Sequence, residues 1–248
     1  MDETSRAEPE REKLKYMKNF AVKHPVIFSI LLFFAGLVLA LVCSLPCAVI
    51  GLENGTDIGR ILASVILLLV FRYALPKNSF FKGLGLIIPG LLFVAWNIVY
   101  NLLSGASVTT PGLADVIACI APALFEETIF RVISIYFLKE NGRSDLEALI
   151  LSAVIFGAVH LTNIAGMTPV NAAVQAGYAA VIGLVFGAVY LRSQDMVSVI
   201  LLHFLIDFSN RFFTGSTVTT PVMIIAFVIV LVIEAVYAVT LVKGRTKN

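Results

Sequence analysis

Long apolar runs recur along this chain and constrain its fold more than any other feature of the sequence. A helix needs about 20 consecutive, mostly apolar residues to cross a bilayer, and runs of that kind cover most of the chain. They occupy, approximately, residues 26–50, 58–75, 84–103, 113–138, 146–161, 170–191, 197–213 and 220–242. This pattern predicts an all-α, polytopic membrane helix bundle with about eight transmembrane helices.

The composition agrees with a membrane protein. Of the 248 residues, 59% are hydrophobic and 14% are charged, and the mean hydropathy is +0.95. A soluble domain of this length could not bury so much apolar surface, so the excess is expected to face lipid. The first apolar run is as long as a full span and is not followed by a small-residue cleavage site, which argues against a signal peptide. We expect an integral protein of a bacterial cytoplasmic membrane.

Basic residues predict the orientation, because cytoplasmic loops hold an excess of Lys and Arg. If the N-terminus is cytoplasmic, Arg60 and Arg211 fall outside, Arg131 lies within a helix, and the rest of the 18 basic residues fall inside. Both termini are therefore predicted to be cytoplasmic. We expect one protease-like membrane domain over residues 26–242, between a basic tail (1–25) that can contact anionic lipid and a short tail (243–248). The net charge of +2 gives no sign of a nucleic-acid partner.

Ionisable residues inside the apolar runs point to a functional site, because a charge at membrane depth is costly unless it is paired or hydrated. These residues are Glu126, Glu127, Arg131, His160, His203, Asp207 and Glu234. Two of the three histidines are among them. The sequence predicts a hydrogen-bond partner for Glu234 and a helix-capping role for Asp115. Gly183 and Gly187 form a GxxxG pattern that predicts close packing against a neighbouring helix.

Helical spacing separates the two adjacent glutamates. Glu127 and Arg131 are four residues apart and can pair, whereas Glu126 points about 100° away around the helix axis. Glu126 is thus predicted to lack a local counter-charge, and an apolar pocket raises the proton affinity of a carboxylate, which suits a general base. Pro122, four residues before Glu126, lacks an amide hydrogen, so it should loosen the helix there and admit water.

Two histidines extend the site onto other helices. His160 follows Phe156 at a spacing of four residues, and Asp207 follows His203 in the same way. Three helices are therefore predicted to converge on one polar cavity. Such a cavity can activate a water molecule and stabilise an oxyanion.

Three short motifs in this order resemble those of the CPBP intramembrane proteases. The motifs are Glu126-Glu127-Thr-Ile-Phe-Arg131, Phe156-Gly-Ala-Val-His160 and His203-Phe-Leu-Ile-Asp207, which are similar to EExxxR, FxxxH and HxxxN/D. The family includes type II CAAX prenyl endopeptidases and Abi-type proteins linked to bacteriocin processing and immunity. The resemblance spans residues 121–208.

The resemblance implies a role for each motif. Glu126 and His160 would bind and activate the attacking water, and Glu127 and Arg131 would hold the site together. His203 would help to stabilise the oxyanion.

By the same resemblance, Asp207 of the last motif would also help to stabilise the oxyanion. This motif ends in Asp207 where the family often has Asn, and a carboxyl group donates a hydrogen bond only when it is protonated. The chain also has Val132 where the family often has Gly after its arginine.

Other classes of protein remain open on the residues alone. A zinc enzyme could use Glu126, His160, His203 and Asp207 as ligands, although the sequence has no HExxH. A serine or aspartyl intramembrane protease would need a GxSG or GxGD motif, and neither is present. A transporter, or an immunity or secretion-accessory protein that acts by binding, could also carry intramembrane acids and histidines.

The hypothesis we favour is that the protein is a metal-independent glutamic endopeptidase without a cofactor. Its substrates would be membrane-associated peptides or proteins with a hydrophobic, prenylated, leader or anchor segment.

Overall fold

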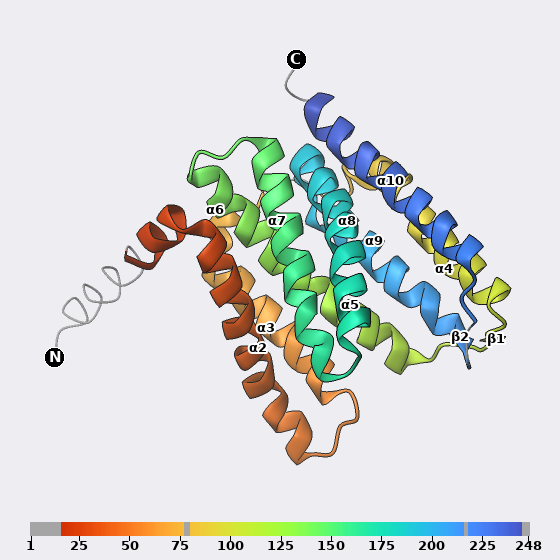
Figure 1. Cartoon of the computed structure of the whole chain (residues 1–248). Helices are drawn as coiled ribbons and strands as arrows, with labels where there is room; N and C mark the ends of the chain where they lie inside the picture. Colours follow the sequence, from red (N-terminus) through yellow and green to blue (C-terminus); the bar gives the residue numbers. More distant parts are fainter. Residues whose placement is uncertain (1–15, 77–79, 216–217, 245–248) are drawn as a thin grey trace.

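The computed structural model describes residues 16–76, 80–215 and 218–244, and within them the chain forms a bundle of helices (Figure 1). The α-helices are α2 (Pro25–Val49), α3 (Gly55–Val70), α4 (Leu91–Leu103), α5 (Leu113–Glu127), α6 (Ile135–Glu140), α7 (Asp145–Val159), α8 (Pro169–Ser193), α9 (Met196–Ser209) and α10 (Pro221–Lys243). Short 3₁₀ segments are η1 (Arg72–Ala74), η2 (Leu84–Leu86), η4 (His160–Ala165) and η5 (Asn210–Phe212), and η3 (Thr128–Ser134) is a π-helix. The predicted all-α class is confirmed. Residues 1–15 and 245–248 of the two predicted tails lie outside the described residues.

Four helical segments are long and apolar enough to cross a membrane. They are Pro25–Val49, Asp145–Ala165, Pro169–Ser193 and Pro221–Lys243. The last of them exposes one apolar side chain after another, including Val222, Ile225, Ile229 and Ile233. Such a surface is unfavourable in water and favourable against lipid, so the chain is an integral membrane protein. Each of the other predicted spans also contains a helix, but eight crossings and their orientation stay a prediction.

The third predicted span differs from the structure. We expected one helix over residues 84–103, but α4 begins only at Leu91. Pro89 and Gly90 precede it, and proline disfavours helical geometry in the residue before it. With 13 residues, α4 is about 20 Å long, which is shorter than the hydrocarbon core of about 30 Å.

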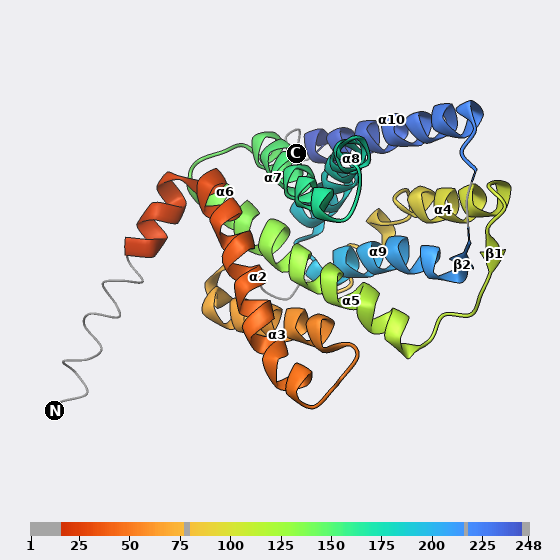
Figure 2. The ribbon, with the colours of Figure 1, turned by 60° about the horizontal axis from the view of Figure 1, so that its bottom comes forward.

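The segment α5–η3–α6 runs through the middle of the bundle. Figure 2 shows α2 and α3 on one side of it and α7, α8 and α10 on the other. The GxxxG glycines let α8 approach α7 closely, because a Cβ atom on Gly183 would lie 3.2 Å from Cα of Ala153 and one on Gly187 would lie 2.9 Å from Cδ1 of Leu149. The central segment is therefore enclosed by tightly packed helices.

A small antiparallel sheet joins two distant loops. Strand β1 (Ser107–Val108) lies between α4 and α5, strand β2 (Phe213–Thr214) precedes α10, and Ser107 pairs with Thr214. The sheet lies at the end of the bundle opposite the C-terminal end of α10 (Figure 1). It ties the start of α5 to the end of α9, the two helices that hold most of the candidate site.

Candidate active site

His203 lies at the centre of a group of carboxyl side chains from α5 and α9. Its Nδ1 atom is 2.9 Å from Oε1 of Glu127. Its Nε2 atom is 3.5 Å from Oδ2 of Asp207 and 3.9 Å from Oε2 of Glu126. The ring is almost buried and stacks on Phe186, with 5.0 Å between the ring centroids. The structure thus brings one predicted imidazole together with all three predicted acids of the site.

Glu127 and Arg131 form a fully buried ion pair. Nε of Arg131 is 3.0 Å from Oε2 of Glu127, and both side chains have no exposed surface. The guanidinium group also lies over the ring of Phe156, 4.2 Å from its centroid, and donates a long hydrogen bond of 3.5 Å to the carbonyl of Gly183. A carboxylate that pairs with arginine only accepts hydrogen bonds, so Nδ1 of His203 donates to Glu127. The ring is therefore held with Nε2 directed at Glu126 and Asp207.

Glu126 is the least engaged of the three acids. Its side chain is 20% exposed, and its one short polar contact in the described part of the chain is the 3.9 Å distance to His203. That distance is too long for a hydrogen bond. The carboxyl group is free to bond a water molecule or a substrate, in contrast to Glu127.

His160 directly follows α7, as its C-cap and the first residue of η4, and has a defined orientation. Its Nδ1 atom is 2.7 Å from the carbonyl oxygen of Phe156, and because a carbonyl can only accept, Nδ1 carries the proton. In the neutral ring, Nε2 then has a lone pair available. His160 is near enough to interact electrostatically with Glu126, and it lines the same cavity as His203 and Asp207.

The chain between the glutamates and α6 is wound as a π-helix. Every residue of Thr128–Ser134 is buried, and Oγ of Ser134 donates to the carbonyl of Ile129, five residues earlier. Segments of π-helix are rare and are frequent at functional sites. The sequence predicts a loosened helix near Pro122, yet α5 continues through that residue, and the irregular winding begins six residues later.

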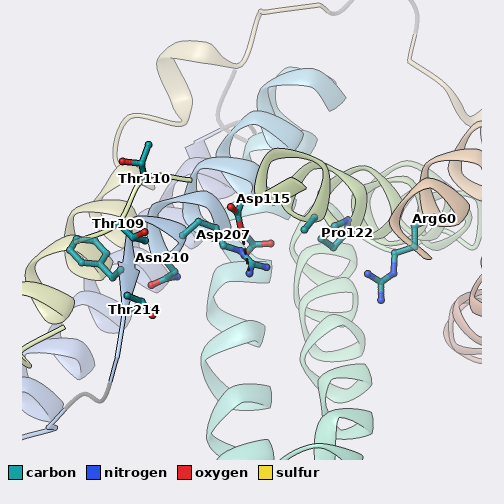
Figure 3. Close-up of a pocket in the computed structure, with 11 residues that line it drawn as sticks. Arg60, Thr109, Thr110, Asp115, Pro122, Asp207, Asn210 and Thr214 are labelled. Carbon is teal, nitrogen blue, oxygen red and sulfur yellow. Dashed lines mark ion pairs between the residues drawn. The ribbon is translucent and has the colours of Figure 1, made fainter. Parts of the chain in front are cut away.

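Two cavities meet at the end of α9. The first, which we call the aromatic cavity, has a volume of about 790 Å³ and includes Trp96, Tyr178, Phe227, His160 and His203 in its lining. The second, the polar pocket, has a volume of about 720 Å³ and is shown in Figure 3. Its lining residues are Arg60, Thr109, Thr110, Asp115, Ala118, Pro122, Asp207, Asn210, Arg211, Phe213 and Thr214. Asp207 and Asn210 line both, so the two cavities are neighbours at the candidate site.

Some site features differ from the sequence predictions or were missed by them. Glu234 is fully buried, but neither of its carboxyl oxygens has a hydrogen-bond partner in the described residues, so the predicted partner is wrong. Asp115 does cap α5, since its Oδ2 atom accepts from the amide of Gly112. The ring of Phe186 against His203 was not anticipated, because Phe186 belongs to no motif.

A metal centre was one of the alternatives from the sequence. Within residues 16–76, 80–215 and 218–244, no group of three or more His, Cys, Asp or Glu side chains is arranged to hold a metal ion. The carboxyl group of Glu127 and the ring of His203 are hydrogen-bonded to each other.

Comparison with protein families gives a match for the segment that contains the site. Residues 109–209 match the family described as Type II CAAX prenyl endopeptidase Rce1-like. The segment includes the three motifs and runs from the residue after β1 to the end of α9. The resemblance predicted from the motifs is confirmed over these residues. No curated protein and no solved structure matches the chain.

Proposed function

We propose that this chain, whose residues 109–209 match the type II CAAX prenyl endopeptidase Rce1-like family, hydrolyses peptide bonds of membrane-associated substrates with Glu126 as the general base. The family match supports a protease that works on peptides in a lipid environment. The observation that carries the finer proposal is the difference between the adjacent acids: Glu127 is held by Arg131 and His203, whereas Glu126 has no hydrogen bond in the described residues.

The first step is attack by water. Glu126 accepts a proton from a water molecule while the water oxygen bonds to the carbonyl carbon of the scissile peptide. His160 orients that water through the lone pair on Nε2, because its Nδ1 proton is held by the carbonyl of Phe156. The electron pair of the carbonyl bond moves to its oxygen and forms a tetrahedral oxyanion.

The second step is collapse of the oxyanion. Because Nδ1–H of His203 is bonded to Glu127, the donor to the negative oxygen is Nε2–H of the doubly protonated ring or the hydroxyl of protonated Asp207, which is the usual electrostatic contribution in acyl transfer. The carbon–nitrogen bond then breaks, and Glu126 returns its proton to the leaving amine. Glu127 and Arg131 act through His203, whose ring they position, and do not touch the substrate.

The aromatic cavity is the proposed site for the apolar part of the substrate. Trp96 and Phe227 stack with 5.4 Å between their ring centroids, and Tyr178 lies edge-on to Phe227. Asn97 and Gln175 also line this cavity and can bond to a peptide backbone. An apolar peptide segment or a prenyl chain fits this combination of rings and amides.

The test is cleavage of a mixed library of peptides and prenylated peptides by the purified full chain. We expect wild type to cleave and Glu126→Gln to lose cleavage, with activity retained in the presence of a chelator. Glu234→Gln is the matched control, because it makes the same change at another glutamate within an apolar helix but away from the cavities.

Other outcomes would overturn parts of the proposal. Loss of cleavage with chelator would make the same side chains metal ligands. A cellular phenotype that persists in Glu126→Gln, with no cleavage by wild type, would favour a protein that acts by binding alone, as an immunity or secretion-accessory protein would.

A further inference from the structure

Two basic residues are predicted to lie on the non-cytoplasmic side of the membrane, and both line the same pocket. Basic residues are disfavoured on that side, and Arg60 and Arg211 are the two that the predicted orientation places there. They are 151 positions apart in the sequence, on α3 and η5, yet both line the polar pocket. The pocket thus brings together two guanidinium groups that the orientation rule disfavours on this side, beside the carboxyl groups of Asp115 and Asp207.

The polar pocket reaches from the candidate site to α3. Asp207 and Asn210 line it at the site, and in the view of Figure 3 Pro122 lies between Asp207 and Arg60. The hydroxyl-bearing Thr109 and Thr110 contribute further polar lining. A peptide with its scissile bond near His203 could therefore extend one of its ends into this pocket.

The two guanidinium groups have donors to spare. Nη1 of Arg60 pairs with Asp57 at 2.9 Å. Arg211 has a side-chain hydrogen bond with the thiol of Cys119, and its Nη1 atom is 4.0 Å from Asp115, a distance beyond hydrogen bonding. Each guanidinium has five N–H donors, so most of them are left for another partner. Asp207 also faces the pocket, but its carboxyl group is already 3.5 Å from His203.

We propose that the polar pocket binds a carboxylate group of the substrate peptide, with Arg211 as its principal partner and Arg60 as a second one. This inference rests on the proposed function, because it assigns the pocket to the molecule that is cleaved. A carboxylate suits arginine because the planar guanidinium offers two parallel donors to its two oxygens. The substrate thus has an apolar segment for the aromatic cavity and an acidic group on the other side of the scissile bond.

The test uses four fluorescein-labelled peptides with the same apolar core. They combine a C-terminal carboxylate or amide with a glutamate or glutamine next to it, so that the terminal and side-chain sources of a carboxylate are separated. Binding is measured by fluorescence anisotropy on the detergent-purified full chain that carries Glu126→Gln, which removes the proposed base. Cleavage of the same peptides is measured on the chain with Glu126 intact.

Variants of the arginines are compared in both experiments. Arg211→Gln and the double variant with Arg60→Gln remove the proposed partners. Arg143→Gln is the matched control, because its side chain is 48% exposed against 47% for Arg211 and pairs with Glu147, but it lies outside the pocket.

We expect the peptides that carry either the terminal carboxylate or the glutamate to bind about tenfold more tightly than those with the corresponding amide or glutamine, as a charge-assisted hydrogen bond provides. Arg211→Gln should abolish that preference, and Arg143→Gln should leave it unchanged. Equal binding of all four peptides, or a preference that survives in the double variant, would overturn the inference. So would Arg211-dependent binding of phosphatidylglycerol in mixed micelles without any discrimination among peptides.

The binding experiment also separates this inference from the proposed protease activity. If the carboxylate preference depends on Arg211 but no peptide is cleaved with Glu126 intact, the protease proposal fails and the pocket assignment stands. If cleavage occurs without a carboxylate preference, the pocket assignment fails and the protease proposal stands.

Discussion

Alanine at Gly183 should disturb both the bundle and the candidate site. A Cβ atom there would lie 3.1 Å from Cδ1 of Phe156, 3.2 Å from Cα of Ala153 and 3.4 Å from Nη2 of Arg131. Carbon atoms pack best at about 3.5–4.0 Å, so α8 would have to move away from α7 by a few tenths of an ångström. Gly177→Ala is the matched control, because Gly177 is on the same helix and has no atom within 4 Å of its added Cβ.

The magnitude follows from the difference between these two variants. Overpacking of a tight contact costs about 1–3 kcal/mol. Replacing glycine by alanine inside a helix gains up to about 1 kcal/mol, and this gain is the same in both variants, so it cancels. Gly183→Ala should therefore be less stable than Gly177→Ala by about 1–3 kcal/mol, or about 2–12 °C in Tm for a chain of this size.

Thermal unfolding of both variants in the same detergent gives the measurement. Cleavage should also fall in Gly183→Ala, because a displaced Phe156 moves the carbonyl that holds His160 and the ring that lies under Arg131. Equal melting temperatures for the two variants would show that α7 and α8 do not pack as described.

Three further predictions concern acids within the apolar helices. Glu127→Gln should lower the free energy of unfolding by about 3–5 kcal/mol, because it leaves Arg131 buried and unpaired. Glu126→Gln should melt like wild type. Thermal unfolding of both variants checks this, and an equal loss of stability in the two would contradict it. Asp207→Asn should keep cleavage and Asp207→Leu should lose it, because an amide donates a hydrogen bond; a fully active leucine variant would remove Asp207 from the oxyanion role. Glu234→Met should raise the free energy of unfolding by about 1–3 kcal/mol, because both buried oxygens lack partners, and a lower melting temperature would show that this carboxyl is needed.

The helices were predictable where a local pattern exists. Each apolar run contains a helix, and the four-residue spacing of Glu127 and Arg131 predicts the pair that the structure contains. The two-residue strands β1 and β2 were not predictable, since they are too short for an alternating pattern and pair across more than 100 residues. The late start of α4 follows from Pro89 and Gly90, a signal that the long apolar run obscured.

The sequence predicted which residues belong to the candidate site better than it predicted the contacts between them. Helical spacing places His203 and Asp207 on one face, but it cannot tell that His203 bonds to Glu127 on another helix. That contact depends on how α5 packs against α9. Arg60 could not be assigned to the site for the same reason, because α3 contributes no motif and reaches the polar pocket only through the packing of the bundle.

The π-helix makes the length of the central segment as important as its composition. A π-turn closes its hydrogen bond over one residue more than an α-turn, so Thr128–Ser134 holds an extra residue that a regular helix would not need. Deleting one residue there would let the segment wind as an α-helix with little change in direction, whereas winding all seven residues as an α-helix would turn the glutamate pair by about 100° relative to α6. Descendants of this sequence can therefore lose one codon in this stretch and keep the glutamate pair facing α9, whereas substitutions that favour regular α-winding at the full length would turn the candidate site away from the rest of the bundle.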